Sequence, residues 1–154
     1  TGGLLYTRLK FLAALGLSAF IELLYHDDYT STPQVHEQAT YAPSLKKTDG
    51  ELNFQNRNSQ ELLNQIRALR PWPGCYTYLN QKRLKIFSAE RSEKNLEPGD
   101  FQLAEDGPLV GTKDVALRLT DIQLEGKKRL SGEKFASGLM GQKENFRLEK
   151  GKKD

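Results

Sequence analysis

The chain has 154 residues, of which 37% are hydrophobic and 28% are charged. This length allows one domain or a small domain with an appendage, and the composition is typical of a soluble globular protein with a modest core and long polar loops. The single cysteine excludes an internal disulfide. The cysteine and the two histidines do not have zinc-ligand spacing, so we expect no metal site.

The net charge of +3 is distributed unevenly along the chain. Residues 127–154 hold nine cations and four anions, whereas residues 101–126 hold two cations and five anions. Concentrated positive charge is typical of proteins that bind a polyanion, and a solvated basic tail has the same composition.

The first 25 residues predict one long helix. Thr1 or Gly2 can cap it, and leucine and phenylalanine recur at steps of three to five residues, as on a buried helix face. The apolar run Phe11–Ile21 also has the length of a signal-peptide core, but it is too short for a membrane span. It continues into Glu22 and further leucines without a cleavage site, so we interpret it as a packed helix.

A polar stretch broken by Pro33 and Pro43 follows, with a turn expected at residues 48–50. The segment NSQELLNQIRAL then predicts a helix, because Asn58 or Ser59 can cap it and its leucines and isoleucine form one stripe. Prolines 71 and 73 end this helix, and Gly74 permits a sharp reversal of the chain.

After Gly74 the sequence period changes to two. Strands are expected at residues 75–79 and 83–89 with a turn at 80–82, and in the second strand Arg83, Lys85 and Phe87 face away from Leu84 and Ile86. Two short strands around residues 106–107, a long strand within 114–124 and a short helix at 131–139 complete the chain. The order predicts an α+β fold, in which a helix leads into a small β-barrel or a strongly twisted sheet.

No catalytic motif is present in this sequence. The WPGC segment has no second cysteine two residues further on and no helix that starts there, so we interpret Cys75 as a small buried residue. There is no nucleophile elbow and no phosphate-binding glycine loop, and no carboxylates have the spacing of an acid/base pair.

Two clusters of cations are the candidate binding residues. Lys82, Arg83 and Lys85 lie on or beside the expected hairpin, and Lys127, Lys128 and Arg129 follow the long strand, with Lys134 shortly after. Clusters at the strand ends of a small barrel could line one groove and neutralise phosphates. The alternative is that these residues only solubilise the chain.

Four stretches, in this order, resemble the methionyl-tRNA formyltransferase family: TGGLLYTRLKFLAALG, ATYAPSLKKTDGELNF, NQIRALRPWPGCYTYLNQKRLKIF and DVALRLTDIQLEGKKRLSGEKFASG. The resemblance implies that residues 1–27 are the last helix of a catalytic domain and residues 28–44 a linker. Residues 45–154 would then be a C-terminal open barrel of OB-like topology with one or two short helices. It also implies that the catalytic Asn, His and Asp and the folate pocket lie upstream of Thr1. This chain alone should therefore be inactive and hold no cofactor.

The family's full-length enzyme moves a formyl group from 10-formyltetrahydrofolate to the amino group of methionyl initiator tRNA. The resemblance therefore implies tRNA as the partner of a cytoplasmic, monomeric protein that binds no membrane. It adds Lys46 and Lys47, which lie just after the linker, to the candidate RNA-contacting cations. Related folate-linked hydrolases and sugar-nucleotide formyltransferases share the two-domain plan without binding tRNA, and a non-catalytic interaction module is a third reading.

Overall fold

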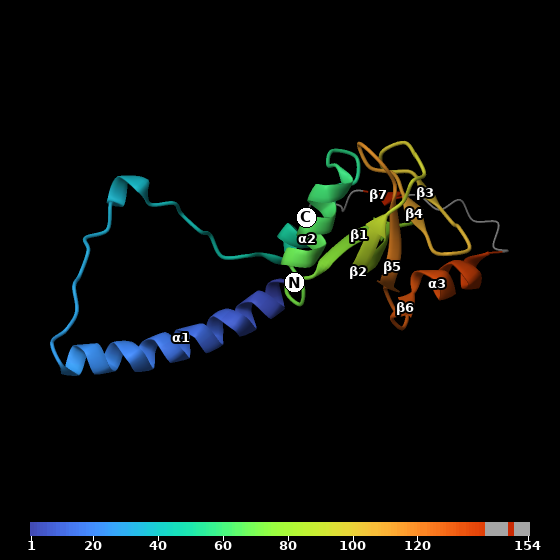
Figure 1. Ribbon diagram of the computed structural model, residues 1–154. Coiled ribbons are helices and arrows are strands. Elements are labelled where there is room, and N and C mark those ends of the chain that lie inside the picture. Colours follow the sequence, from blue (N-terminus) through green and yellow to red (C-terminus); the bar gives the residue numbers. More distant parts are fainter. Residues whose placement is uncertain (141–147, 150–154) are drawn as a thin grey trace.

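Helix α1 (Gly2–Tyr25) projects away from the rest of the chain in the computed structural model, which describes residues 1–140 and 148–149 (Figure 1). The hydroxyl of Thr1 caps it by accepting a hydrogen bond from the Leu4 amide at 3.3 Å. The helix itself was predicted correctly, but the prediction that it is packed was wrong, because no residue of α1 is buried. It meets the sheet-bearing part at its first turn, where the Gly3 amide donates to the Arg70 carbonyl at 2.9 Å. The described chain offers the rest of its apolar surface no helix or strand to pack against.

Helix α1 has 24 residues and is long and apolar enough to cross a membrane. The expectation that the segment is too short was therefore wrong, because Leu4, Leu5 and Leu9 extend the apolar stretch toward the N-terminus. Core helices of soluble proteins and signal sequences have the same length and composition, so this property is weak evidence for a membrane span.

The segment after α1, which includes the linker predicted at residues 28–44, is exposed and returns from the far end of α1 to the sheet-bearing part (Figure 1). It contains the 3-10 helix η1 (His36–Gln38), and a second one, η2 (Lys47–Gly50), stands where a turn was expected. After η2 the chain runs beside β1 (Cys75–Leu79), and the Leu52 amide donates to the Tyr76 carbonyl at 2.8 Å. A Cβ on Gly50 would come within 2.0 Å of the Gly74 carbonyl oxygen, so this close approach requires glycine.

Helix α2 (Ser59–Ala68) begins at a capping box in which Asn58 and Glu61 each accept a hydrogen bond from the other's backbone amide. Its buried residues include Leu62 and Ile66, from the predicted stripe. The peptide bonds before Pro71 and Pro73 are both cis. Gly74, with φ of 79°, completes the corner by donating its amide to the Leu69 carbonyl at 2.9 Å.

The described strands form one antiparallel sheet in the order β3-β4-β5-β2-β1-β7, with β6 paired to β5. The strands other than β1 are β2 (Lys82–Arg91), β3 (Phe101–Gln102), β4 (Leu109–Val110), β5 (Leu117–Leu124), β6 (Leu130–Ser131) and β7 (Leu148–Glu149). Helix α3 (Gly132–Leu139) lies against β5, and α2 lies against β2 (Figure 1). The α+β class and the open sheet are thus confirmed.

The β1–β2 hairpin has a two-residue turn rather than the expected three. Asn80 and Gln81 have φ of 47° and 66°, the left-handed pair that suits the twist of a tight hairpin. The predicted alternation of β2 is confirmed, because Leu84 and Ile86 are buried while Arg83 and Lys85 are exposed. The core lies between the sheet and its two helices, and its fully buried large residues include Leu62, Leu84, Leu109, Leu117, Leu119 and Ile122.

Candidate nucleic-acid interface

A cavity of about 570 Å³ opens between the end of α2, the Pro–Trp–Pro corner and the β1–β2 hairpin. We call it the corner pocket. The side chains that matter to its chemistry are Lys47, Arg70, Trp72, Arg83, Lys85 and Arg129. Among the described residues that line the pocket there are five cations and no Asp or Glu, and a counter-charge comes from Asp121, which pairs with Arg129 from outside the lining.

The alternation of β2 supplies one wall of the pocket. Arg83, Lys85 and Phe87 share the face opposite the core, and all three line the pocket. The Arg83 guanidinium lies 4.3 Å from the centre of the Tyr76 ring and donates a hydrogen bond to the Tyr78 hydroxyl at 3.2 Å. That hydrogen bond raises the pKa of Arg83, so its charge is fixed.

The chain after β5 brings a third cation to the same wall. The Glu125 amide donates to the Arg83 carbonyl at 2.8 Å, which anchors the turn beside the start of β2. The Arg129 guanidinium then lies 4.0 Å from the centre of the Phe87 ring. Its Nε donates to Asp121 Oδ1 at 2.7 Å, and this contact lowers the pKa of the Asp121 carboxyl. Both arginines are therefore held over aromatic faces, where a cation is attracted by the ring.

The remaining cations come from the corner and from η2. Arg70 follows the C-terminal cap of α2, and its Nη1 donates to the Phe87 carbonyl at 3.4 Å. Lys47 reaches the pocket because η2 packs its Gly50 against the corner. Within residues 1–140, Lys47 and Lys85 have no carboxylate at ion-pair distance, so both ammonium groups are available to an anion.

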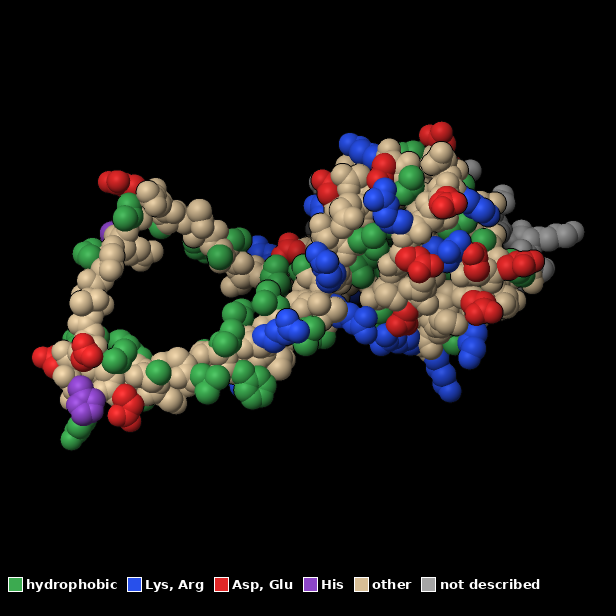
Figure 2. Space-filling view, in the orientation of Figure 1, with side chains coloured by type: hydrophobic (Ala, Val, Ile, Leu, Met, Phe, Trp, Pro, Cys, Tyr) green, Lys and Arg blue, Asp and Glu red, His purple; other side chains and the backbone are tan. Residues whose placement is uncertain are grey.

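The structure brings four of the nine predicted cations together at this pocket: Lys47, Arg83, Lys85 and Arg129. Five others are exposed but do not line it: Lys46, Lys82, Lys127, Lys128 and Lys134. Lys82 is separated from Arg83 by the pleat of the strand, and Lys134 lies on α3. Figure 2 shows Lys and Arg side chains gathered where α1 joins the rest of the chain and along the adjoining lower edge.

Arg70 and Trp72 were not among the predicted site residues. The sequence contained a signal for this pair, because a cation and an aromatic residue flank the first proline of the corner. The prolines themselves predicted only the end of a helix, and the position of Arg70 at the pocket depends on the fold of the corner.

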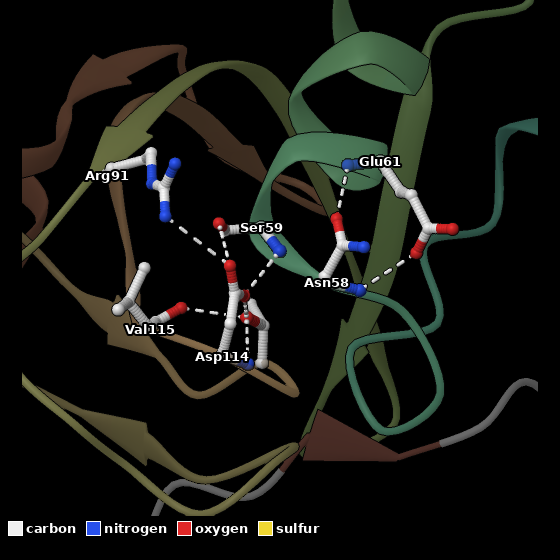
Figure 3. A network of polar contacts seen from close by, with 7 residues as sticks. Asn58, Ser59, Glu61, Arg91, Asp114 and Val115 are labelled. Atoms are coloured by element: carbon white, nitrogen blue, oxygen red, sulfur yellow. Dashed lines mark hydrogen bonds and ion pairs between the residues drawn. The ribbon is translucent and has the colours of Figure 1, made fainter.

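The most strongly perturbed carboxyl in the described chain serves the fold and does not line the pocket (Figure 3). Burial of Asp114 by itself would raise its pKa. Hydrogen bonds from Thr112 and from the amide and hydroxyl of Ser59 outweigh that effect and hold the pKa well below its usual range. These hydrogen bonds lie at 2.6–2.7 Å, and they connect Asp114 to the first turn of α2. Asp114 thus anchors the N-terminal end of α2. Its contacts do not form a pair of groups that could act as a general acid and base.

Cys75 is buried, as predicted, and burial raises the pKa of its thiol to about 11. A thiol with such a pKa is almost fully protonated at neutral pH and is a poor nucleophile. In residues 1–140 and 148–149 no three His, Cys, Asp or Glu side chains are grouped to hold a metal ion. What the site can do chemically is bind an anion that has a flat, apolar part.

Comparison with known proteins defines the class to which this site belongs. Residues 44–140 match the family described as formyl transferase, C-terminal domain, and the chain belongs to that family. The sheet, α2 and the corner pocket all lie within this match, apart from β7.

Two curated relatives of this chain are methionyl-tRNA formyltransferases. The chain is 40% identical over 131 residues to the methionyl-tRNA formyltransferase of Koribacter versatilis. The aligned residues cover 82% of this chain and 42% of that protein. The Bacillus subtilis methionyl-tRNA formyltransferase is 39% identical over 140 residues, covering 88% of this chain and 44% of that protein. The chain therefore spans less than half the length of these relatives.

A solved structure supports the fold alone. A variant of HypX from Aquifex aeolicus superposes with a TM-score of 0.60 at 20% identity, over 83% of this chain and 23% of that one. At this level of identity the likeness says nothing of shared substrates.

Proposed function

We propose that this chain is the tRNA-binding, C-terminal part of a methionyl-tRNA formyltransferase. In this proposal the full-length protein is cytoplasmic and monomeric. It transfers a formyl group from 10-formyltetrahydrofolate to the amino group of methionyl initiator tRNA. Residues 1–27 are the last helix of its catalytic domain, residues 28–44 the linker and residues 45–154 the OB-like domain. The exposed apolar surface of α1 is the surface that the rest of the catalytic domain would cover.

The observation that carries the proposal is the corner pocket, where five cations and no carboxylate are among the described lining residues. A phosphate backbone is the partner that such a site fits, because each neutralised phosphate releases condensed counterions. The name shared by the curated relatives supports tRNA as the polyanion.

The alternative is a folate-dependent formyltransferase or hydrolase with a substrate other than tRNA. It has less support, because the likeness to HypX is 20% identity whereas the likeness to the tRNA enzymes is 40%. A positive, acid-free pocket also has no evident use in an enzyme whose substrate is small and is bound by the other domain.

A salt titration of tRNA binding tests the proposal. In the triple variant Lys127→Ala, Lys128→Ala, Arg129→Ala, affinity should fall similarly for initiator and elongator tRNA, since backbone contacts carry little sequence information. The slope of log affinity against log salt should flatten by up to about 0.9 for each phosphate that the variant no longer neutralises. Equal slopes for this variant and the unchanged chain would contradict a role of this cluster in RNA binding.

The matched control removes three charges elsewhere, at Lys150, Lys152 and Lys153. These lysines lie outside the described residues and were predicted to form a frayed tail. Their replacement by Ala should change the slope much less. A larger loss of affinity in the tail variant would move the RNA contact to the C-terminus, and no measurable tRNA binding at low salt would refute the proposed function.

A further inference from the structure

The corner pocket has a feature that backbone binding does not use. Trp72 lines it with 57% of its surface exposed, whereas tryptophan side chains are on average highly buried in folded proteins. The other two aromatic rings of the pocket are already occupied, since Arg83 lies over Tyr76 and Arg129 over Phe87. Within the described residues Trp72 has neither a ring partner nor a cation over its face.

The three arginines of the pocket are held in place by hydrogen bonds. Arg83 is tied to Tyr78, Arg129 to Asp121 and Arg70 to the Phe87 carbonyl. The two lysines of the pocket, Lys47 and Lys85, have no ion-pair partner in the part of the chain that the structure describes. The site therefore offers one free flat apolar surface and, beside it, fixed positive charge.

A nucleotide has the matching chemistry, with a planar base and a phosphate joined through a sugar. Every base presents a π-face that stacks on tryptophan, and stacking tolerates any sequence. The volume of about 570 Å³ lies within the usual range for sites that enclose a small molecule. A base inside a duplex cannot reach a concave site of this kind, because both of its faces are stacked.

We propose that the corner pocket binds one unpaired nucleotide of the RNA, with the base stacked on Trp72 and the phosphate held by Lys85 and Arg70. This inference rests on the proposed function in taking RNA as the ligand, and it assigns to the pocket a preference for single-stranded over paired segments. The cations outside the pocket, such as Lys127 and Lys128, would then contact backbone only.

Trp72 is itself the probe, because it is the single tryptophan of the chain. Its fluorescence should be quenched saturably by a short single-stranded oligonucleotide, such as an adenylate trimer with a 5′ phosphate. A blunt duplex of the same nucleotide concentration and inorganic phosphate should leave it unchanged. Equal quenching by the duplex, or by an acidic peptide of the same charge, would overturn the proposal, and so would the absence of quenching by the single strand.

Variants separate this pocket from RNA binding as a whole. Trp72→Ala should weaken oligonucleotide and tRNA binding about tenfold, the order expected when one base can no longer stack, and Trp72→Phe should recover most of it. The control Lys113→Ala removes an exposed cation from a loop that does not line the pocket. It should have little effect.

The outcomes are distinguishable from those of the proposed function. If tRNA binds with normal affinity to Trp72→Ala but poorly to the Lys127–Arg129 variant, the pocket proposal fails while the proposed function stands. If tRNA does not bind at all, the proposed function fails, and quenching of Trp72 by the single strand still decides the pocket. Because Trp72 is exposed, its replacement should leave the core intact, and an unchanged midpoint of urea unfolding checks that it does.

Discussion

Asp114 joins two segments that are far apart in the sequence, and its removal should destabilise the domain substantially. Its carboxylate accepts hydrogen bonds from both the amide and the hydroxyl of Ser59, 55 residues away, each at 2.7 Å. Ser59 is fully buried at the start of α2. In an Asp114→Ala variant, two buried donors of Ser59 would be left without their partner at once.

The expected size of this effect follows from those two donors. A buried polar group left without its partner costs about 1–3 kcal/mol, so the sum would be about 2–6 kcal/mol. Asp114 is itself 36% exposed, so water can reach the vacated space and the lower half of this range is expected. A decrease of about 2–4 kcal/mol in the free energy of unfolding is large for a domain of this size.

Arg91→Ala is the matched control. It removes the ion-pair partner of Asp114, which lies at 3.4 Å and whose arginine is 54% exposed. An exposed pair of this kind contributes about 0–1 kcal/mol. Urea unfolding should be followed by near-ultraviolet circular dichroism, because the edge-to-face pair of Tyr76 and Tyr78 reports the sheet whereas α1 dominates the far-ultraviolet signal. A decrease for Asp114→Ala below about 0.5 kcal/mol, or equal to that of Arg91→Ala, would refute the reasoning.

The same network predicts a pH dependence. The pKa of Asp114 is lowered in the folded state, so its contribution is complete above the unfolded pKa of about 3.9 and is lost as pH falls toward the folded pKa. The stability difference between the unchanged chain and Asp114→Ala should therefore be constant from pH 7 to about pH 5 and shrink below about pH 4. A difference that grows on acidification would contradict the assignment.

Two further predictions concern the interior. Cys75 is buried and the pKa of its thiol is raised, so it should react slowly with a thiol reagent in the folded chain and rapidly in urea. Cys75→Ala should lower the free energy of unfolding by about 1 kcal/mol. Rapid labelling of the folded chain would contradict the burial of Cys75. A Cβ on Gly132 would lie 1.9 Å from the Leu119 carbonyl oxygen, so Gly132→Ala should destabilise by about 1–3 kcal/mol in urea. The control is Gly138→Ala on the same helix, where an added Cβ meets open space, so stability should be unchanged or slightly raised. Equal effects of the two substitutions would contradict the explanation that contact with the Leu119 carbonyl destabilises Gly132→Ala.

Local patterns in the sequence determined the elements that are long and regular. The helices of residues 2–25 and 59–68 follow from capping residues and apolar spacing, since both depend on neighbours within four positions. Strand β1 has its predicted bounds, and the alternation along β2 correctly assigned Arg83 and Lys85 to the outer face. The strands β6 and β7 have two residues each, too few for a period to show, and they form because β5 and β1 offer unpaired edges.

Tertiary structure alone decided which cations share a site. Arg70, Lys47 and Arg129 come from three segments, and they meet because the corner reverses the chain, Gly50 packs beneath it and the turn after β5 is anchored to Arg83. It also decided the role of Asp114, whose partner lies 55 residues away. Charge in a sequence shows how many cations a segment has, but a binding site depends on distances between segments, and these distances are set by contacts that no local pattern records.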